Sequence, residues 1–152
     1  MTKILGSRWV KTTGIAFGVL LLIAFAGYQF WEPGWRYGVR GVDVSRHQET
    51  IDWTSLANDD TAFAYIKATE GEDWVDVRFS QNWQSAGETG VLRGAYHFFT
   101  FCASGADQAA NMIATLPDEP GMLPPAVDLE FSGNCSARPS VEDFGIELGV
   151  FL

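Results

Sequence analysis

The chain has 152 residues, of which 47% are hydrophobic, 14% aromatic and 19% charged. This composition is too apolar for a disordered protein and too mixed for a protein with many membrane spans. The formal net charge of −9 argues against nucleic acid as a partner, because binding phosphates requires a basic surface. The length suits one domain with a hydrophobic core rather than two.

The N-terminal segment has the composition of a membrane helix. Residues 12–31 contain no charged side chain, and Lys3, Arg8 and Lys11 precede them. A run of about twenty such residues can cross the hydrocarbon core of a bilayer, and basic residues before it favour a cytoplasmic N-terminus. We therefore predict a signal anchor or transmembrane helix over residues 1–31.

The same segment predicts where the rest of the chain resides. Residues 32–37 have the composition of a short turn-prone linker, and residues 38–152 form the body. We expect the body outside the cytoplasm, in the periplasm or at the cell surface, attached to the inner or plasma membrane. The alternative is secretion after cleavage near Ala26, since Ala24-Phe25-Ala26 has the small-x-small form of a signal-peptide site.

The body contains two cysteines, Cys102 and Cys135. In an oxidising compartment a lone pair of cysteines favours a disulfide, and two small buried thiols are the alternative. The triplet Asn134-Cys135-Ser136 also matches the N-glycosylation sequon, which would compete with that disulfide. With two histidines and two cysteines in the chain, the sequence predicts no metal site.

Apolar, β-prone segments alternate with helical patterns along the body. Connections long enough to contain a helix normally join parallel strands. The sequence therefore predicts an α/β fold, for which an open doubly wound sheet and a closed β/α barrel both fit. Ser140 is a plausible N-cap for the helix expected last. The predicted strands are 38–45, 62–69, 92–99 and 124–131, and the helical faces include Ile51, Trp53 and Leu56, then Phe79, Trp83 and Ala86, then Ala106, Ala109, Ala110, Ile113 and Leu116.

Carboxylates mark the expected C-terminal ends of two strands. Asp128 and Glu130 alternate with Val127 and Leu129, so a strand would direct both carboxylates to one face. Active sites of β/α barrels lie at these strand ends, and Asp43 has the equivalent position in the first strand. The alternative is a solvated strand end with capping carboxylates.

Aromatic residues near the same strand ends suit a carbohydrate. Tyr65 and Tyr96 could pack their rings against the C–H groups of a sugar, with core packing as the alternative. His97 could transfer protons, although a structural histidine is the more common case. No glycine-rich phosphate loop is present, so the sequence gives nucleotide binding no support.

Four stretches carry a family resemblance when they are taken in order. They are Gly41–Ser45 with the Gln48 that follows, Phe63–Gly71, Arg93–Phe98 and Leu123–Glu130. Together they resemble the N-terminal half of the catalytic domain of glycoside hydrolase family 25 lysozymes, which are peptidoglycan muramidases. The resemblance implies a truncated, irregular β/α barrel that comprises the first four β/α units and follows the N-terminal transmembrane helix.

The resemblance also implies residue roles. Glu130 would be the general acid, Asp128 would position the 2-acetamido group or stabilise the developing positive charge, and Asp43 would be the third cleft carboxylate. Peptidoglycan glycan strands would be the substrate, cleaved at the β-1,4 bond between N-acetylmuramic acid and N-acetylglucosamine without any cofactor. Cys102 and Cys135 would meet at the rim of the catalytic cleft.

The expected loss of half the barrel leaves two functional hypotheses. The first is a peptidoglycan muramidase of which this chain, or its source gene, is a truncated form. The second is an exported peptidoglycan-binding module that lacks catalytic competence. Half a barrel leaves open strand edges and an uncovered apolar interior, so we expect low stability for the isolated body.

Overall fold

The computed structural model describes residues 38–152. The predicted membrane segment 1–31 and the linker 32–37 lie outside the described residues. Within the described part of the chain, no helix is long and apolar enough to span a membrane.

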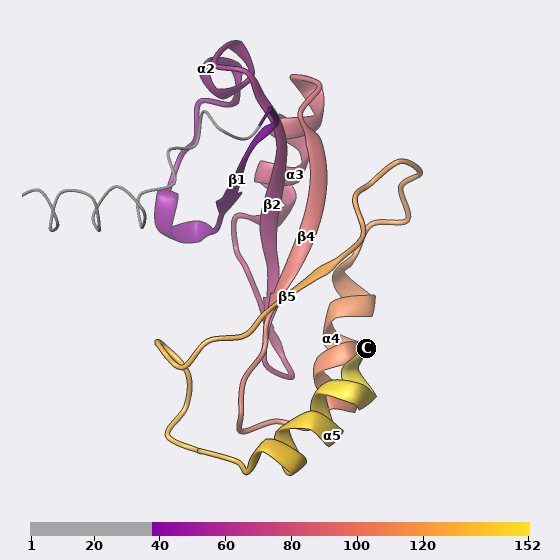
Figure 1. The fold of residues 1–152 in the computed structure, drawn as a ribbon. Helices are drawn as coiled ribbons and strands as arrows, with labels where there is room; N and C mark the ends of the chain where they lie inside the picture. Colours follow the sequence, from indigo (N-terminus) through magenta and orange to yellow (C-terminus); the bar gives the residue numbers. More distant parts are fainter. Residues whose placement is uncertain (1–37) are drawn as a thin grey trace, which may run out of the picture. The chain divides into compact units, whose positions relative to one another are not determined.

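A curled sheet of parallel strands forms the centre of the body (Figure 1). Its four parallel strands have the order β1-β2-β4-β5, and the short β3 pairs with β2 in the antiparallel sense. The predicted parallel α/β arrangement is therefore confirmed. The strands are β1 (Arg40–Val44), β2 (Thr61–Glu70), β3 (Trp74–Val75), β4 (Leu92–Phe98) and β5 (Ala126–Asp128).

A helix follows each of the four parallel strands, and side-chain caps define where several of these helices begin. Asp52, Ser104 and Ser140 each accept a hydrogen bond from a backbone N–H in the first turn of the following helix, as N-cap residues do. Ser140 is thus the N-cap that the sequence predicts. The helices are α2 (Trp53–Asn58), α3 (Phe79–Glu88), α4 (Gly105–Thr115), α5 (Val141–Phe151) and the 3-10 helix η2 (Arg46–Gln48).

The hydrophobic core lies between the sheet and α2, α3 and α4. Strand β2 directs Ala64, Ile66 and Ala68 into this layer, and none of the three exposes any surface. Because side chains alternate along a strand, the residues between them face the opposite side of the sheet. One face of the sheet is therefore closed by helices, and the other carries the polar and aromatic side chains considered below.

Helix α5 packs against α4, and its Phe144 and Phe151 contact the rings of His97 and Phe99 at the end of β4. Its other side exposes Val141, Ile146 and Val150, which are 91%, 58% and 55% exposed. A helix that is apolar on both sides normally has neighbours on both sides. Within residues 38–152, β1 and β5 each pair with one strand only, so the sheet has two free edges.

The last predicted strand is shorter than expected. The sequence predicts a strand over 124–131, whereas β5 comprises only Ala126–Asp128, and Glu130 lies beyond its end. Pro124 and Pro125 have no N–H with which to extend the ladder in one direction. In the other direction, a side chain from the following loop takes over the hydrogen bonding, as described below. The sequence analysis also missed β3 and η2.

A tight helix–helix contact provides a first test of this fold. A Cβ atom at Gly105 would overlap the Glu147 carbonyl of α5, so α5 must move in Gly105→Ala. We expect this variant to lower the free energy of unfolding by about 1–3 kcal/mol in urea denaturation followed by tryptophan fluorescence.

The matched control for this test is Gly145→Ala in α5. An added Cβ there meets nothing within 4 Å, so removing a helical glycine should raise stability by roughly 0.5–1 kcal/mol. Unchanged stability in Gly105→Ala would contradict the described α4–α5 packing.

Candidate active site

The open face of the sheet brings together four of the predicted site residues. Asp43 pairs in register with Tyr65 on the adjacent strand, and Tyr65 pairs with Gly94 on the next. Tyr96 lies two residues beyond Gly94, and Asp128 is two residues beyond the Ala126 that pairs with Tyr96. Because register partners and alternate residues share a face, Asp43, Tyr65, Tyr96 and Asp128 lie on one surface.

Tyr96 occupies the electrostatic centre of this group. Burial raises the pKa of its hydroxyl, and the negative charges of Asp43, Asp128 and Asp76 raise it further, whereas a hydrogen bond with Ser45 lowers it. The phenol therefore stays protonated throughout the physiological range. It can donate a hydrogen bond beside two carboxylates, but it cannot serve as a base there.

Tyr65 has a structural partner on this face. Its hydroxyl donates to the Pro124 carbonyl at 3.0 Å, which ties β2 to the residues immediately before β5. Its ring lies over Gly94, where an added Cβ would overlap the ring atoms. The small residue on β4 therefore makes room for the tyrosine that the sequence predicts as a substrate contact.

Lys67 adds a cation that the sequence analysis missed. Its side chain is almost buried, with Nζ 2.6 Å from the Glu70 carboxylate and lying over the rings of Phe98 and Trp74. A charged residue flanked by Ile66 and Ala68 in an apolar strand is the signal that could have identified it. On this face, Lys67 partly balances the negative charge of the aspartates.

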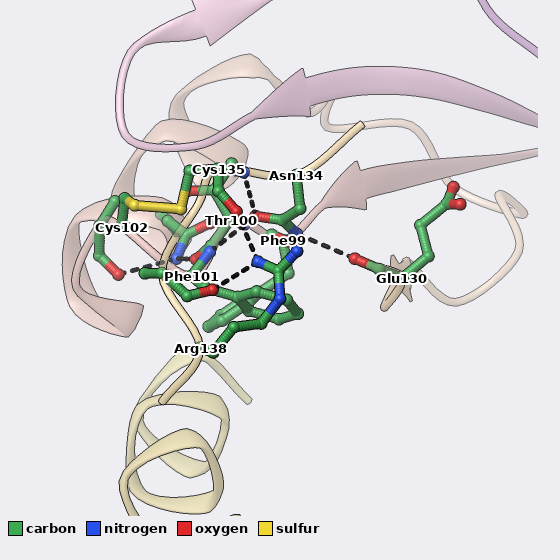
Figure 2. The surroundings of a disulfide bond; sticks show 11 residues. Phe99, Thr100, Phe101, Cys102, Glu130, Asn134, Cys135 and Arg138 are labelled. Atoms are coloured by element: carbon green, nitrogen blue, oxygen red, sulfur yellow. Dashed lines mark hydrogen bonds between the residues drawn. A yellow bond between two sulfur atoms is a disulfide. The ribbon is translucent and has the colours of Figure 1, made fainter. Parts of the chain in front are cut away.

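Glu130 lies at the rim rather than on the sheet. Its side chain is exposed and extends away from the disulfide, as Figure 2 shows. The residue borders an open, apolar pocket with a volume of about 220 Å³. The pocket is lined mainly by apolar side chains, among them Phe101, Leu129, Phe131, Val141 and Phe144.

A disulfide joins the loops that follow β4 and β5. Cys102 and Cys135 have an S–S distance of 2.08 Å and a Cα–Cα distance of 6.3 Å. The neighbouring Asn134 side chain is half-buried and donates from Nδ2 to the Phe99 and Glu130 carbonyls, at 2.8 and 3.0 Å. An N-linked glycan would be attached to this same nitrogen. Glycosylation of the sequon would therefore compete with the two hydrogen bonds that Asn134 donates in the fold.

His97 lies on the opposite face of β4 and has no exposed surface. The Gln108 amide donates to two backbone carbonyls, so its oxygen must accept from His97 Nε2, at 3.1 Å. His97 Nδ1 then accepts from the Thr69 hydroxyl at 2.7 Å. The imidazole is therefore a neutral structural group facing the helices, and the proton-transfer interpretation of His97 is wrong.

Comparison with known proteins identifies the family to which the chain belongs. The model of glycosyl hydrolases family 25 matches residues 42–145. The chain belongs to this family. The match confirms the resemblance carried by the four stretches of sequence, and it includes Asp43, Asp128 and Glu130.

Solved family 25 structures share this fold. The family 25 glycosyl hydrolase of Bacillus anthracis superimposes with a TM-score of 0.74 at 43% identity, covering 80% of this chain and 56% of that one. The lysozyme of Streptomyces coelicolor gives a TM-score of 0.68 at 36% identity, covering 76% and 56%. The chain thus spans just over half the length of these structures.

Curated relatives give the same result. Lysozyme M1 of Streptomyces globisporus is 46% identical over 78 residues, which is 51% of this chain and 26% of that protein. The uncharacterized protein YegX of Escherichia coli K12 is 46% identical over 107 residues, or 67% and 39%. The chain spans less than half the length of these two relatives.

The buried histidine predicts how stability depends on pH. Burial lowers the pKa of His97 below its ordinary value near 6.5, so below that pH the unfolded chain binds a proton that the folded chain does not. Stability should therefore fall as the pH decreases from 7.5 to 5.5, by on the order of 1 kcal/mol in urea unfolding.

Variants of the two histidines separate this effect from the titration of other groups. His97→Gln should reduce the loss between pH 7.5 and 5.5, whereas the same substitution at the exposed His47 should leave it unchanged. An identical pH dependence in wild type and His97→Gln would show that another group is responsible.

Proposed function

We propose that this chain acts in peptidoglycan hydrolysis as a muramidase, at the β-1,4 bond between N-acetylmuramic acid and N-acetylglucosamine. The family match over residues 42–145 carries the proposal. The names of two relatives support it, since one is a lysozyme and another, from Chalaropsis, is an N,O-diacetylmuramidase that is 34% identical over 103 residues.

In this proposal Glu130 is the general acid that protonates the departing glycosidic oxygen. Its exposed side chain at the rim could reach a glycan strand lying across the C-terminal ends of the strands. Asp128 and Asp43 lie further down, on the open face of the sheet. Asp128 would hold the 2-acetamido group or stabilise the positive charge at the sugar, and Asp43 would complete the acidic floor.

The two tyrosines would bind the sugar. The Tyr96 hydroxyl remains protonated beside the aspartates and could donate to a sugar oxygen or to the acetamide carbonyl. Tyr65 would contribute its ring, since its hydroxyl already donates to the Pro124 carbonyl. Hydrolysis with retention through the substrate's own acetamide would then require no second carboxylate nucleophile and no cofactor.

The free edges of the described sheet favour a second candidate function. The chain spans 56% of the Bacillus anthracis structure, and β1 and β5 have free edges within the described residues. The described face could bind peptidoglycan through Asp43, Asp128 and the tyrosines, while hydrolysis would require a completed barrel. In that case further β/α units would have to pair with β5 and cover the exposed side of α5.

The site of action would lie outside the cytoplasm. Peptidoglycan is there, and the Cys102–Cys135 disulfide is of the kind that persists in an oxidising compartment. The segment 1–31, with its uncharged run over residues 12–31, would deliver the body, either as a membrane anchor or as a signal peptide cleaved near Ala26.

Release of reducing ends from purified peptidoglycan tests the proposed acid. We expect Glu130→Gln to lower the rate by at least about 10²-fold, because the amide has no proton to give to the leaving oxygen. Glu142→Gln is the matched control, since Glu142 is an exposed glutamate in the first turn of α5 and should retain the wild-type rate.

Cosedimentation with insoluble peptidoglycan separates the two candidate functions. Binding without any release of reducing ends from a folded wild-type chain would favour the binding module. Asp128→Asn should weaken binding under either function, whereas Glu130→Gln should leave it nearly unchanged. Absence of both binding and release would contradict both candidates.

A further inference from the structure

The β4–β5 ladder stops just before the residue proposed as the acid. The Phe99 N–H donates to the Asp128 carbonyl at 3.0 Å, which is the last backbone bond between these two segments. In a regular parallel ladder, the next bond would run from the Glu130 N–H to the Phe99 carbonyl. That carbonyl instead accepts from Asn134 Nδ2 at 2.8 Å.

Asn134 uses the full hydrogen-bonding capacity of its amide at this point. Besides the Phe99 carbonyl, Nδ2 donates to the Glu130 carbonyl at 3.0 Å. Oδ1 accepts from the backbone N–H groups of Phe101 and Cys135, at 3.0 and 2.9 Å. Two donors and two acceptors fix the orientation of the amide, because a flipped amide would set N–H groups against one another.

Figure 2 shows how the covalent link and the amide lie together. Cys135 follows Asn134 in sequence. Cys102 follows Phe101, whose backbone N–H donates a hydrogen bond to Asn134 Oδ1. The disulfide therefore joins the same two segments one residue beyond the hydrogen bonds. It limits how far Asn134 can move away from the end of β4 without breaking a covalent bond.

We propose that Asn134, held in place by the Cys102–Cys135 disulfide, is the positioning residue for Glu130. The amide replaces the next rung of the ladder, so the Glu130 backbone leaves the sheet at a fixed point and its side chain extends over the rim. This inference rests on the proposed role of Glu130 as the acid. A general acid displaced by about 1 Å can lose on the order of 10²-fold in rate, so such a bridge would affect turnover directly.

Steady-state hydrolysis of peptidoglycan by the 152-residue chain tests the proposal. Asn134→Asp retains both acceptors but loses both donors, and it sets a carboxylate oxygen against the Phe99 and Glu130 carbonyls. We expect kcat to fall about 10- to 100-fold while KM changes by less than about threefold, since the bridge aims the acid and does not touch the glycan.

Further variants separate the bridge from other roles of this loop. Asn134→Ala and the double variant Cys102→Ser, Cys135→Ser should show the same selective loss of kcat, with a smaller loss for the cysteine pair because the amide remains. Ser136→Ala is the matched control. Ser136 is exposed in the same loop, and this substitution removes the glycosylation sequon without altering the Asn134 amide.

Amide hydrogen exchange of the same chain without substrate provides a readout that does not depend on activity. In Asn134→Ala, the Phe101 N–H loses its acceptor and should exchange faster, whereas amides in the middle of β4 should keep their protection. Loss of protection throughout β4 would mean that the variant has unfolded. In that case the exchange of the Phe101 amide is compared with that of mid-β4 amides in Asn134→Asp and in the double cysteine variant instead.

The outcomes distinguish this proposal from the proposed function. An active wild type whose kcat is unchanged in the Asn134 variants would overturn the positioning role and leave Glu130 as the acid. An inactive wild type would overturn hydrolysis by this chain, and the exchange data would then decide the structural part. Faster exchange confined to Phe101 and its neighbours supports the bridge, and unchanged exchange overturns it.

Discussion

The parallel pairing of β4 with β5 is the constraint on which the candidate site depends. It joins only three residue pairs, ending with Phe98 and Asp128. Within this short ladder, Val127 and His97 turn towards the helices while Asp128 turns towards the open face. A shift of β5 by one residue would turn Asp128 towards the helices and Val127 towards the open face. Hydrogen bonds before and after β5, from the Tyr65 hydroxyl to the Pro124 carbonyl and from Asn134 Nδ2 to the Glu130 carbonyl, stabilise this register.

The two faces of the sheet handle polar groups in opposite ways. On the helix side, His97 is neutral and fully hydrogen-bonded, because an unpaired charge in that layer would be costly. On the open side, Lys67 forms an ion pair with Glu70, and the protonated Tyr96 lies near Asp43 and Asp128. Binding a polar glycan requires the second kind of surface, and a stable scaffold beneath it requires the first.

Sequence reasoning predicted the features that local pattern controls. Alternation and helical spacing gave the parallel strands, and the Ser140 cap follows from the residue type at a helix start. The extent of β5 was wrong because Val127 and Leu129 continue the alternation while the hydrogen bonds do not. The Asn134 side chain ends the ladder there, and only the fold brings its amide to Phe99. The contact of Lys67 with the Phe98 ring is of the same non-local kind.

The candidate carboxylates and the open edges of the sheet belong to different parts of this chain. The backbone positions of Asp43, Asp128 and Glu130 are fixed by the pairing of β1 with β2, the pairing of β4 with β5, and the disulfide loop. The free edge of β5 and the exposed Val141 and Ile146 are different, because burial of apolar surface and closure of the sheet require a neighbour. Neighbouring β/α units would therefore act mainly by supplying the opposite wall of the cleft and by excluding water, rather than by arranging the carboxylates.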